Sequence, residues 1–325
     1  SSSNQFKGNM DLGKLEAAMR EWGPERVAYV RMEASTNLIG GQPFSMQNLK
    51  DVKAVSSRFG IPLVFDGSLI SENAYFIQQR EPEFADWSVQ EIILEMMRSV
   101  DIFYMSGRKS AAVRGGLIAT DSKEAFNKLL VWLPVYEGFA TYGGMSTKEV
   151  EAMAVGLHEM TAQSVASSSA DFIAYFVERL VEMGVPVVTP AGGLACHVDA
   201  RRFIPQVPQS LYPAGALAAA VYLVSGVRGM ERGSVSMDRD AQGNDVPADM
   251  ELVRLALPRR TFTLSHIEYT ADRLKWLFAH RDLIGGLRFR EEPPVLRFFF
   301  GRLEPVDGWV ENLAAAFRAE FGAGC

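Results

Sequence analysis

The first half of the sequence alternates between two kinds of apolar pattern. A period of three to four residues predicts amphipathic helices over 12–22, 46–59 and 89–97. Short continuous apolar runs predict buried strands over 27–32, 61–65, 101–105 and 115–120. Strands that alternate with helices in this way are typical of right-handed βαβ units. We therefore expect an α/β fold built on a mostly parallel sheet.

The second half begins with a long helical pattern over 146–183, which is rich in Ala, Met and Glu and ends at Gly184. This helix is expected to connect a large domain at 1–150 with a smaller α+β domain at 151–325. Further apolar runs in the second domain predict strands over 185–188, 195–199 and 251–256. Helical periods predict helices over 214–225 and 310–321, and the polar stretch 238–249 reads as a surface loop.

Composition and charge exclude several classes of function. The 325-residue chain carries a net charge of −6, whereas surfaces that bind nucleic acid need clustered Lys and Arg. No apolar run approaches the roughly 20 residues that span a bilayer, and the polar start lacks the apolar core of a signal peptide. Two cysteines, Cys196 and Cys325, make no disulfide framework. We therefore expect a cytoplasmic protein that binds neither nucleic acid nor a membrane.

Both ends of the sequence look truncated. The Ser-rich start has no initiator methionine, and the tail at 320–325 stops without a natural closing element. We expect a domain taken from a larger protein, and a trimmed tag with a natural terminus is an equally good explanation.

Two predicted strand ends carry groups suited to chemistry. Asp66 follows the strand at 61–65, and the run Ser106-Gly107-Arg108-Lys109 follows the strand at 101–105. Functional groups gather at the carboxyl ends of strands in α/β sheets. Pyridoxal phosphate (PLP) requires a lysine amine for its Schiff base and a carboxylate that keeps its pyridine nitrogen protonated. The spacing alone leaves open that Asp66 caps a strand and that the lysine lies in a solvated turn.

Several short motifs occur in one order along nearly the whole chain, from Phe6-Lys7-Gly8-Asn9 to Leu296-Arg297-Phe298-Phe299. The most specific stretches are Asn37-Leu38-Ile39-Gly40-Gly41-Gln42-Pro43, Glu72-Asn73-Ala74-Tyr75-Phe76, Met105-Ser106-Gly107-Arg108-Lys109, Tyr136-Glu137-Gly138, Tyr142-Gly143-Gly144, Met230-Glu231-Arg232-Gly233 and Arg254-Leu255-Ala256-Leu257-Pro258-Arg259. With these motifs the chain resembles the tryptophanase and tyrosine phenol-lyase family of β-eliminating lyases. The resemblance implies PLP fold type I, like aspartate aminotransferase, with PLP as cofactor in the large domain and no metal.

The resemblance also implies a role for each matching cofactor residue. Lys109 matches the Schiff-base lysine, which also moves the α-proton of the substrate. Asp66 matches the partner of the pyridine nitrogen, and Asn37 matches the donor to the phenolic oxygen of the cofactor. Ser106 matches a phosphate ligand, and Arg108 occupies a neighbouring basic position.

A second set of matching residues is implied to face the substrate. Arg254 matches the arginine that clamps the α-carboxylate, a bidentate task suited to guanidinium. Arg232 matches an arginine that phenol-lyases use near the leaving group, and a structural ion pair is the alternative for it. Phe298 and Phe299 follow the phenol-lyase pattern, and we expect Phe139 in the same substrate pocket.

Four departures from the family pattern matter. The N-terminal part of the family is absent, and it normally supplies a glycine-containing phosphate loop, an aromatic residue stacked on PLP and a catalytic tyrosine. Those parts lie on residues beyond this sequence, come from another chain, or are lacking in an inactive piece. Leu69 stands where relatives have an arginine, and Leu194 stands where they have a histidine. Arg114 lies near their monovalent-cation site; we hypothesise that its guanidinium replaces the ion, and a surface arginine is the alternative.

These departures favour retained PLP chemistry with a changed substrate. A thiolate or persulfide leaves more readily than an aromatic carbon, which must first be protonated. We therefore expect β-elimination that cleaves the C–S bond of a cysteine-type substrate, free or carrier-bound, as in cysteine-lyase-like domains of some polyketide synthases. The alternatives are a tyrosine phenol-lyase or tryptophanase that cleaves a C–C bond to give pyruvate and ammonium, a non-catalytic scaffold, and an aminotransferase. Analogy with the fold predicts a homodimer or tetramer.

Overall fold

The computed structural model describes residues 4–258 and 261–322. Within these ranges the chain folds into two compact units. The first unit holds the chain up to Asp171 together with Gly192–Leu194, and the second holds Phe172–Ala191 and the chain from Ala195 onward. Arg259, at the end of one matched motif, and Cys325 lie outside the described residues. No helix in the described ranges is long and apolar enough to cross a bilayer.

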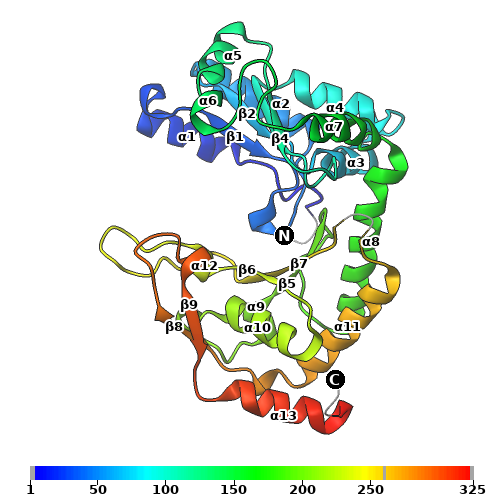
Figure 1. Ribbon diagram of the computed structural model, residues 1–325, viewed down its shortest axis with the longest axis vertical. Coiled ribbons are helices and arrows are strands. Elements are labelled where there is room, and N and C mark those ends of the chain that lie inside the picture. The colour runs from blue at the N-terminus through cyan, green and yellow to red at the C-terminus, as the bar shows by residue number, and fades with distance from the viewer. Residues whose placement is uncertain (1–3, 259–260, 323–325) are drawn as a thin grey trace. The chain divides into compact units, whose positions relative to one another are not determined.

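A four-stranded sheet organises the first unit (Figure 1). Its strands, in spatial order, are β1 (Val30–Glu33), β2 (Leu63–Asp66), β3 (Ile102–Ser106) and β4 (Gly116–Ala119). The first three run parallel, and β4 pairs antiparallel with β3. The predicted α/β class and mostly parallel sheet are thus confirmed. Because β2 and β3 are parallel neighbours, their carboxyl ends meet at one edge of the sheet.

Helices occupy the chain between these strands. The first unit contains α1 (Leu12–Trp22), α2 (Met46–Arg58), α3 (Ile70–Arg80), α4 (Val89–Arg98), α5 (Lys123–Leu130), α6 (Leu133–Tyr136) and α7 (Thr147–Glu159). The predicted helices over 12–22, 46–59 and 89–97 are confirmed. Side-chain caps fix their starts: Asp11 accepts from the Lys14 N–H, Ser45 caps α2, and Ser88 forms a capping box with Glu91.

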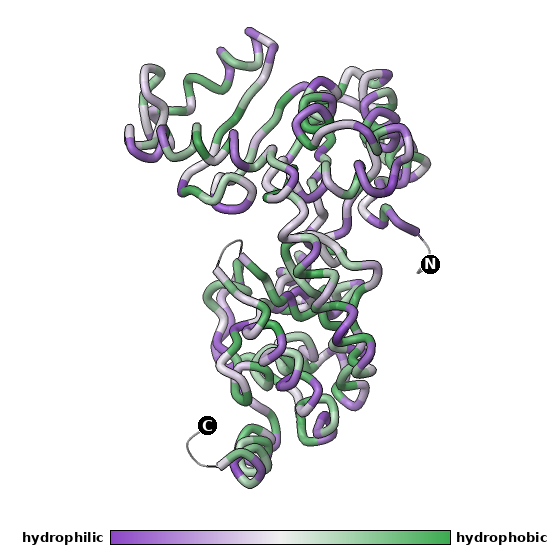
Figure 2. Tube along the Cα trace, turned by 90° about the vertical axis from the view of Figure 1, so that its right-hand side faces the viewer, coloured by the Kyte–Doolittle hydropathy of each residue, from purple (hydrophilic) through white to green (hydrophobic). Residues whose placement is uncertain are grey.

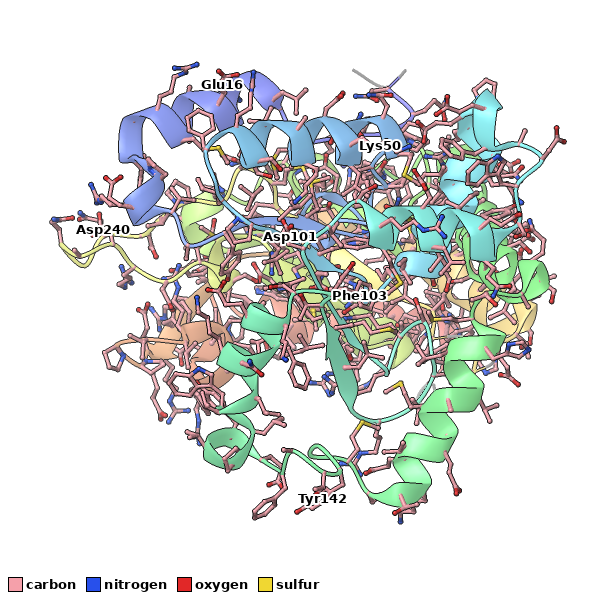
Figure 3. All side chains as sticks on the ribbon, turned by 90° about the horizontal axis from the view of Figure 1, so that it is seen from above. Glu16, Lys50, Asp101, Phe103, Tyr142 and Asp240 are labelled. Carbon is pink, nitrogen blue, oxygen red and sulfur yellow. The ribbon has the colours of Figure 1, made fainter. Side chains whose placement is uncertain are left out.

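Alternate strand residues build the apolar core of the first unit. Phe65 and Phe103 are buried and pack edge to face, with ring centroids 5.7 Å apart. Figure 3 labels Phe103 together with Asp101, near the start of β3, and Lys50 on α2. A Cβ at Gly67 would lie 2.1 Å from the Phe103 ring, so only glycine fits directly after Asp66. The core therefore fixes the chain at the point where β2 ends.

The second unit is built on a three-stranded antiparallel sheet in the order β5 (Ala195–Asp199), β7 (Leu252–Ala256) and β6 (Met230–Arg232). A hairpin joins β8 (Leu287–Glu291) to β9 (Arg302–Pro305). The helices are the later part of α8 (Gln163–Glu182), α9 (Ala200–Phe203), α10 (Pro213–Ser225), α11 (Leu264–Ala279), α12 (Arg297–Phe300) and α13 (Trp309–Phe321). Figure 2 shows both green and purple segments along the helix next to the C terminus, as expected of an amphipathic helix.

Two predictions in the second half of the chain were wrong. The single helix expected over 146–183 is two helices, because α7 ends at Glu159 and α8 begins at Gln163. At the break, both the backbone N–H and the hydroxyl of Thr161 donate to the His158 carbonyl, which takes the place of a continuing helical bond. The run at 185–188 forms one isolated bridge, from Val187 to Val198, instead of a strand.

The apolar pattern does not predict α3, because part of its buried face is polar. Ser71, Glu72 and Asn73 are all completely buried. The Asn73 carbonyl oxygen accepts from the backbone N–H groups of Ser35 (3.1 Å) and Phe44 (3.2 Å), and its amide nitrogen donates to the Phe44 carbonyl (2.9 Å). Asn73 thus holds both ends of the loop that contains Asn37 by hydrogen bonds to its backbone.

Replacing Asn73 with alanine should lower the free energy of unfolding by about 2–4 kcal/mol, because buried backbone groups would lose their partner. Urea denaturation measures the change. Gln79→Ala, an exposed position on the same helix, is the control and should cost less than about 0.5 kcal/mol. Equal stabilities for the two variants would contradict this role of Asn73.

Candidate active site

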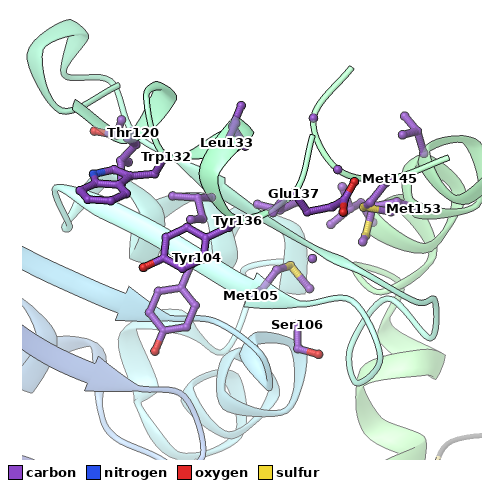
Figure 4. Close-up of a pocket in the computed structure, with 18 of the residues that line it drawn as sticks. Tyr104, Met105, Ser106, Thr120, Trp132, Leu133, Tyr136, Glu137, Met145 and Met153 are labelled. Atoms are coloured by element: carbon purple, nitrogen blue, oxygen red, sulfur yellow. The ribbon is translucent and has the colours of Figure 1, made fainter. Parts of the chain in front are cut away.

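Asp66, Ser106 and Lys109 line one pocket in the first unit. The pocket has a volume of about 1200 Å³, somewhat above the roughly 300–1,000 Å³ of many small-molecule sites. Figure 4 shows Ser106 and Tyr104, both from β3, along the same side of it. A carboxylate, an amine and a hydroxyl, predicted from two separate strand ends, therefore face a shared cavity.

Ser68 links the two loops that carry these groups. Its backbone N–H donates to the Asp66 carboxylate at 3.0 Å, and its hydroxyl accepts from the Ser106 N–H at 3.0 Å. Its carbonyl accepts from the hydroxyl of Ser110 at 3.1 Å, one residue after Lys109. The loops after β2 and β3 are therefore joined on either side of the lysine, which fixes their spacing.

The remaining walls of the pocket are mainly apolar and aromatic. They come from β4, α5, α6, α7 and the loop before α7, and include Leu117, Phe126, Trp132, Tyr136, Met145 and Met153. Figure 4 shows Trp132 and Tyr136 on one side and Met145 and Met153 on the other. Glu137 adds a second carboxylate. A small polar end therefore adjoins a broad apolar wall, which suits a ligand with one charged and one apolar part.

Three predicted residues of the first unit do not appear among the described residues that line this pocket: Asn37, Arg108 and Phe139. The backbone N–H of Asn37 donates to the Glu33 carboxylate at 3.1 Å. Arg108 is exposed. Phe139 is 61% exposed, and its ring lies 5.7 Å from that of Tyr142, which Figure 3 shows in the loop before α7. Their roles stay predictions.

The structure shows what surrounds the three positions that depart from the family pattern. Leu69 and Leu194 are both buried in the apolar core of the first unit. Arg114 is exposed. Hydrogen bonds from Ser146 are the main cause of a lowered pKa at Glu149, and the nearby charge of Arg114 contributes to it. Arg114 therefore lies near a carboxylate at the start of α7, and its replacement of a cation stays a hypothesis.

The predicted substrate residues of the second unit gather around its sheet. Arg254, on the central strand β7, pairs in register with His197 on one side and Met230 on the other. Arg232 lies two residues beyond Met230, and its guanidinium lies 5.7 Å from the centre of the Phe298 ring. Phe298 and Phe299 pack edge to face at 5.1 Å. Two guanidinium groups on one face make this part of the second unit suitable for an anionic group.

His197 was not among the predicted site residues, yet it is almost completely buried beside Arg254. Burial is the main cause that lowers the pKa of His197 to about 3, and the positive charges of Arg254 and Arg232 add to it. The imidazole is therefore neutral at physiological pH, and it does not add a third positive charge to the two arginines.

The low pKa of His197 predicts how stability depends on pH. An unfolded histidine binds its proton near pH 6.5, whereas His197 in the folded chain does so only near pH 3. Acidification from pH 6.5 towards 3 therefore favours the unfolded state, by an amount on the order of 3 kcal/mol at pH 4. His197→Phe should lose stability less steeply than the parent between pH 7 and pH 4 in thermal denaturation.

His158→Gln, at an exposed position, is the control for this experiment and should follow the parent. The same pH dependence in His197→Phe and in the parent would show that His197 is not held neutral by its surroundings.

Ser68 and Tyr104 are among the lining residues that sequence reasoning missed. A usable signal existed for Tyr104: in a strand, residues two apart point to the same face, so Tyr104 and Ser106 share one. Ser68 gives no such signal, because its role comes from backbone and hydroxyl bonds between two distant loops.

The sequence of this chain is similar to a known protein family and to several curated proteins. A family model described as "Beta-eliminating lyase" matches residues 2–273. Tyrosine phenol-lyase from Symbiobacterium thermophilum is 43% identical over 307 residues, which are 94% of this chain and 67% of that protein. Tryptophanase from Salinibacter ruber is 41% identical over 94% of this chain and 64% of that protein. The chain thus spans about two thirds of the length of these curated relatives.

Solved structures with a similar fold share much less sequence. Serine palmitoyltransferase from Sphingomonas wittichii has a TM-score of 0.56 at 16% identity, over 84% of this chain and 60% of that one. Threonine aldolase from Leishmania major has a TM-score of 0.52 at 15% identity, over 83% of this chain and 68% of that one. These similarities confirm the predicted fold, which is PLP fold type I.

Proposed function

This chain belongs to the β-eliminating lyase family, and from that premise we propose that it is a PLP-dependent lyase that releases a group from the β-carbon of an amino-acid substrate. The observation that carries the proposal is that Lys109, Asp66 and Ser106 line a single pocket. These three groups come from the ends of adjacent parallel strands and the loop that follows them.

The residues of the pocket fit the cofactor. The Lys109 amine would bind its aldehyde carbon, and the Asp66 carboxylate would accept a hydrogen bond from its pyridine N–H. The hydroxyl of Ser106 would donate to its phosphate. A pocket of about 1200 Å³ leaves room for an amino acid beside it. Asn37 and Arg108 are further proposed ligands, on the family resemblance alone.

Bound PLP would supply a protonated ring that accepts the electrons left at Cα when its proton is removed. Once the amino group of the substrate has displaced it from the aldehyde carbon, the Lys109 amine would take that proton from Cα and hold it on Nζ. The bond from Cβ to the leaving group would then break, its electron pair would depart with the leaving group, and the pair left at Cα would form a double bond between Cα and Cβ. With a free amino acid, water taken up by the remaining fragment gives pyruvate and ammonium. The apolar wall around Met145 and Met153 would limit access of water to the carbanionic centre.

In the second unit, Arg254 is the proposed ligand of the substrate α-carboxylate, and Arg232 with Phe298 is proposed to contact its side chain. The packing of the Arg232 guanidinium on the Phe298 ring supports a defined orientation for this arginine. No salt bridge of Arg232 is found among the described residues, so the structural ion pair considered for it has no support there. By analogy with other members of the fold, we also propose a homodimer or tetramer.

Two leaving groups are candidates. The printed names of the relatives, tyrosine phenol-lyase and tryptophanase, favour cleavage of a carbon–carbon bond. The residues of this chain favour cleavage of a carbon–sulfur bond, because the loop after Asp66 carries a buried Leu69 and the segment before β5 carries a buried Leu194. Both substitutions remove a proton-bearing side chain, and a sulfur leaving group needs less help from acids than an aromatic carbon.

Lys109→Ala should reduce release of pyruvate from S-methyl-L-cysteine by about 10³-fold or more in the full-length protein, since the α-proton loses its acceptor. Lactate dehydrogenase-coupled assay measures the rate. Lys123→Ala, an exposed lysine at the start of α5, is the control and should keep full activity. Unchanged turnover in Lys109→Ala would refute the assignment and favour a non-catalytic scaffold for this pocket.

The leaving group is tested by comparing S-methyl-L-cysteine with L-tyrosine under the same conditions. We expect the thioether to be eliminated at least about 100-fold faster, equivalent to a barrier lower by roughly 2.7 kcal/mol. Pyruvate, methanethiol and phenol are measured in parallel. Phenol release from tyrosine at a comparable rate would establish the carbon–carbon alternative.

A further inference from the structure

Arg31, Asp66 and Tyr104 lie on three adjacent strands and point to one face of the first sheet. Asp66 pairs in register with Tyr104 on β3 and with Glu33 on β1. Arg31 precedes Glu33 by two residues, so its side chain leaves the same face. The opposite face, with Phe65 and Phe103, belongs to the apolar core. The three polar side chains therefore form a diagonal row across one face of these strands.

Hydrogen bonds connect this row to the pocket. The Arg31 guanidinium donates to the Tyr104 hydroxyl at 3.4 Å and forms an ion pair with Glu33 at 3.3 Å. Tyr104 is the in-register neighbour of Asp66 on the adjacent strand, so the two side chains leave the same face of the sheet, and the negative charge of Asp66 acts on the Tyr104 hydroxyl. Asp66 and Tyr104 both line the pocket that contains Lys109, and Figure 4 labels Tyr104 among its lining residues.

The electrostatics agree with this geometry. Burial is the main cause that raises the pKa of Tyr104, the negative charge of Asp66 raises it further, and Arg31 opposes both. The hydrogen bond to Tyr104 is in turn the main cause that raises the pKa of Arg31. The other charged groups that face this row are Glu33 on β1 and, across the pocket, Lys109 and Glu137. The phenol is therefore a donor that stays protonated at physiological pH.

We propose that Tyr104, held in place by Arg31, is a positioning residue that orients the Asp66 carboxylate. Ser68 donates to one oxygen of this carboxylate through its backbone N–H, and Tyr104 supplies a side-chain donor from the neighbouring strand. Two donors fix the plane of this carboxylate. The role toward a pyridine nitrogen rests on the proposed function, whereas the contact between Tyr104 and Asp66 does not.

Arg31 supplies a positive charge near Asp66, which the loop after Asp66 does not. The loop continues into Leu69, which is buried and apolar. Arg31 lies on β1 and donates a hydrogen bond to Tyr104. The charge of Asp66 also acts directly on the Arg31 guanidinium. The Tyr104 hydroxyl is thereby polarised by a neighbouring cation, which would strengthen the proposed hydrogen bond from Tyr104 to Asp66.

The contact is tested first in the protein without cofactor, labelled with [¹³Cζ]tyrosine, with the Tyr104 signal assigned from Tyr104→Phe. Asp66→Asn should lower the pKa of Tyr104 and Arg31→Met should raise it, each by about half a pH unit or more. Tyr175, whose hydroxyl donates to Glu268 in the second unit, is the internal control and should titrate unchanged. A Tyr104 signal that titrates identically in the parent and in Asp66→Asn would overturn the contact.

The positioning role is tested by equilibrium dialysis with PLP and by the absorption spectrum of the bound cofactor. Tyr104→Phe should weaken PLP binding by about 5- to 10-fold, as expected for loss of one donor to a charged group, and should change the visible band. Tyr29→Phe, at an exposed position, is the matched control and should do neither. An unchanged affinity and spectrum in Tyr104→Phe would overturn the positioning role. A parent protein that fails to bind PLP while Tyr104 still responds to Asp66→Asn would overturn the proposed function and support the contact.

Discussion

The hydrogen bonds of Ser68 are the constraint on which the pocket depends. They join the loop after β2, with Asp66, to the loop after β3, with Ser106 and Lys109. Parallel pairing brings the two strand ends to one edge, but pairing alone does not fix the loops that continue beyond it. Ser68 does this with its N–H, its hydroxyl and its carbonyl, so a carboxylate and an amine 43 residues apart in sequence share a cavity.

The two faces of the first sheet have different roles: one packs in the apolar core, and the other carries polar groups of the pocket. Phe65 and Phe103 point into the apolar core, and the residues that directly follow them, Asp66 and Tyr104, line the pocket. Because side chains alternate along a strand, each functional group is flanked by residues anchored in the core. The position of the chemical groups is therefore set by packing on the opposite face, and Gly67 lets the chain turn against Phe103.

Much of this arrangement was predictable from the sequence, because strongly apolar runs mark β1 to β4 and strand ends carry Asp66 and Ser106. Family resemblance added Lys109 and the arginines of the second unit. Helix α3 was missed because its buried face carries the polar residues Ser71, Glu72 and Asn73, which a search for apolar periodicity passes over; Asn73 is buried there for its hydrogen bonds to the backbone. The helix expected over 146–183 was broken by a local bond of Thr161 to the His158 carbonyl. His197 was missed because its importance arises from Arg254 on the adjacent strand, which register defines and local sequence does not. Tyr104 was missed although its spacing of two residues from Ser106 gave a local signal.

The central claim is that the Lys109 amine is the group that binds the aldehyde of PLP in a pocket shared with Asp66. Reduction of the PLP-loaded protein with sodium borohydride, followed by proteolysis and mass spectrometry, locates that bond directly. The account predicts that the pyridoxyl label lies on the peptide that contains Lys109. A label on any other lysine, or none after saturation with PLP, would contradict it.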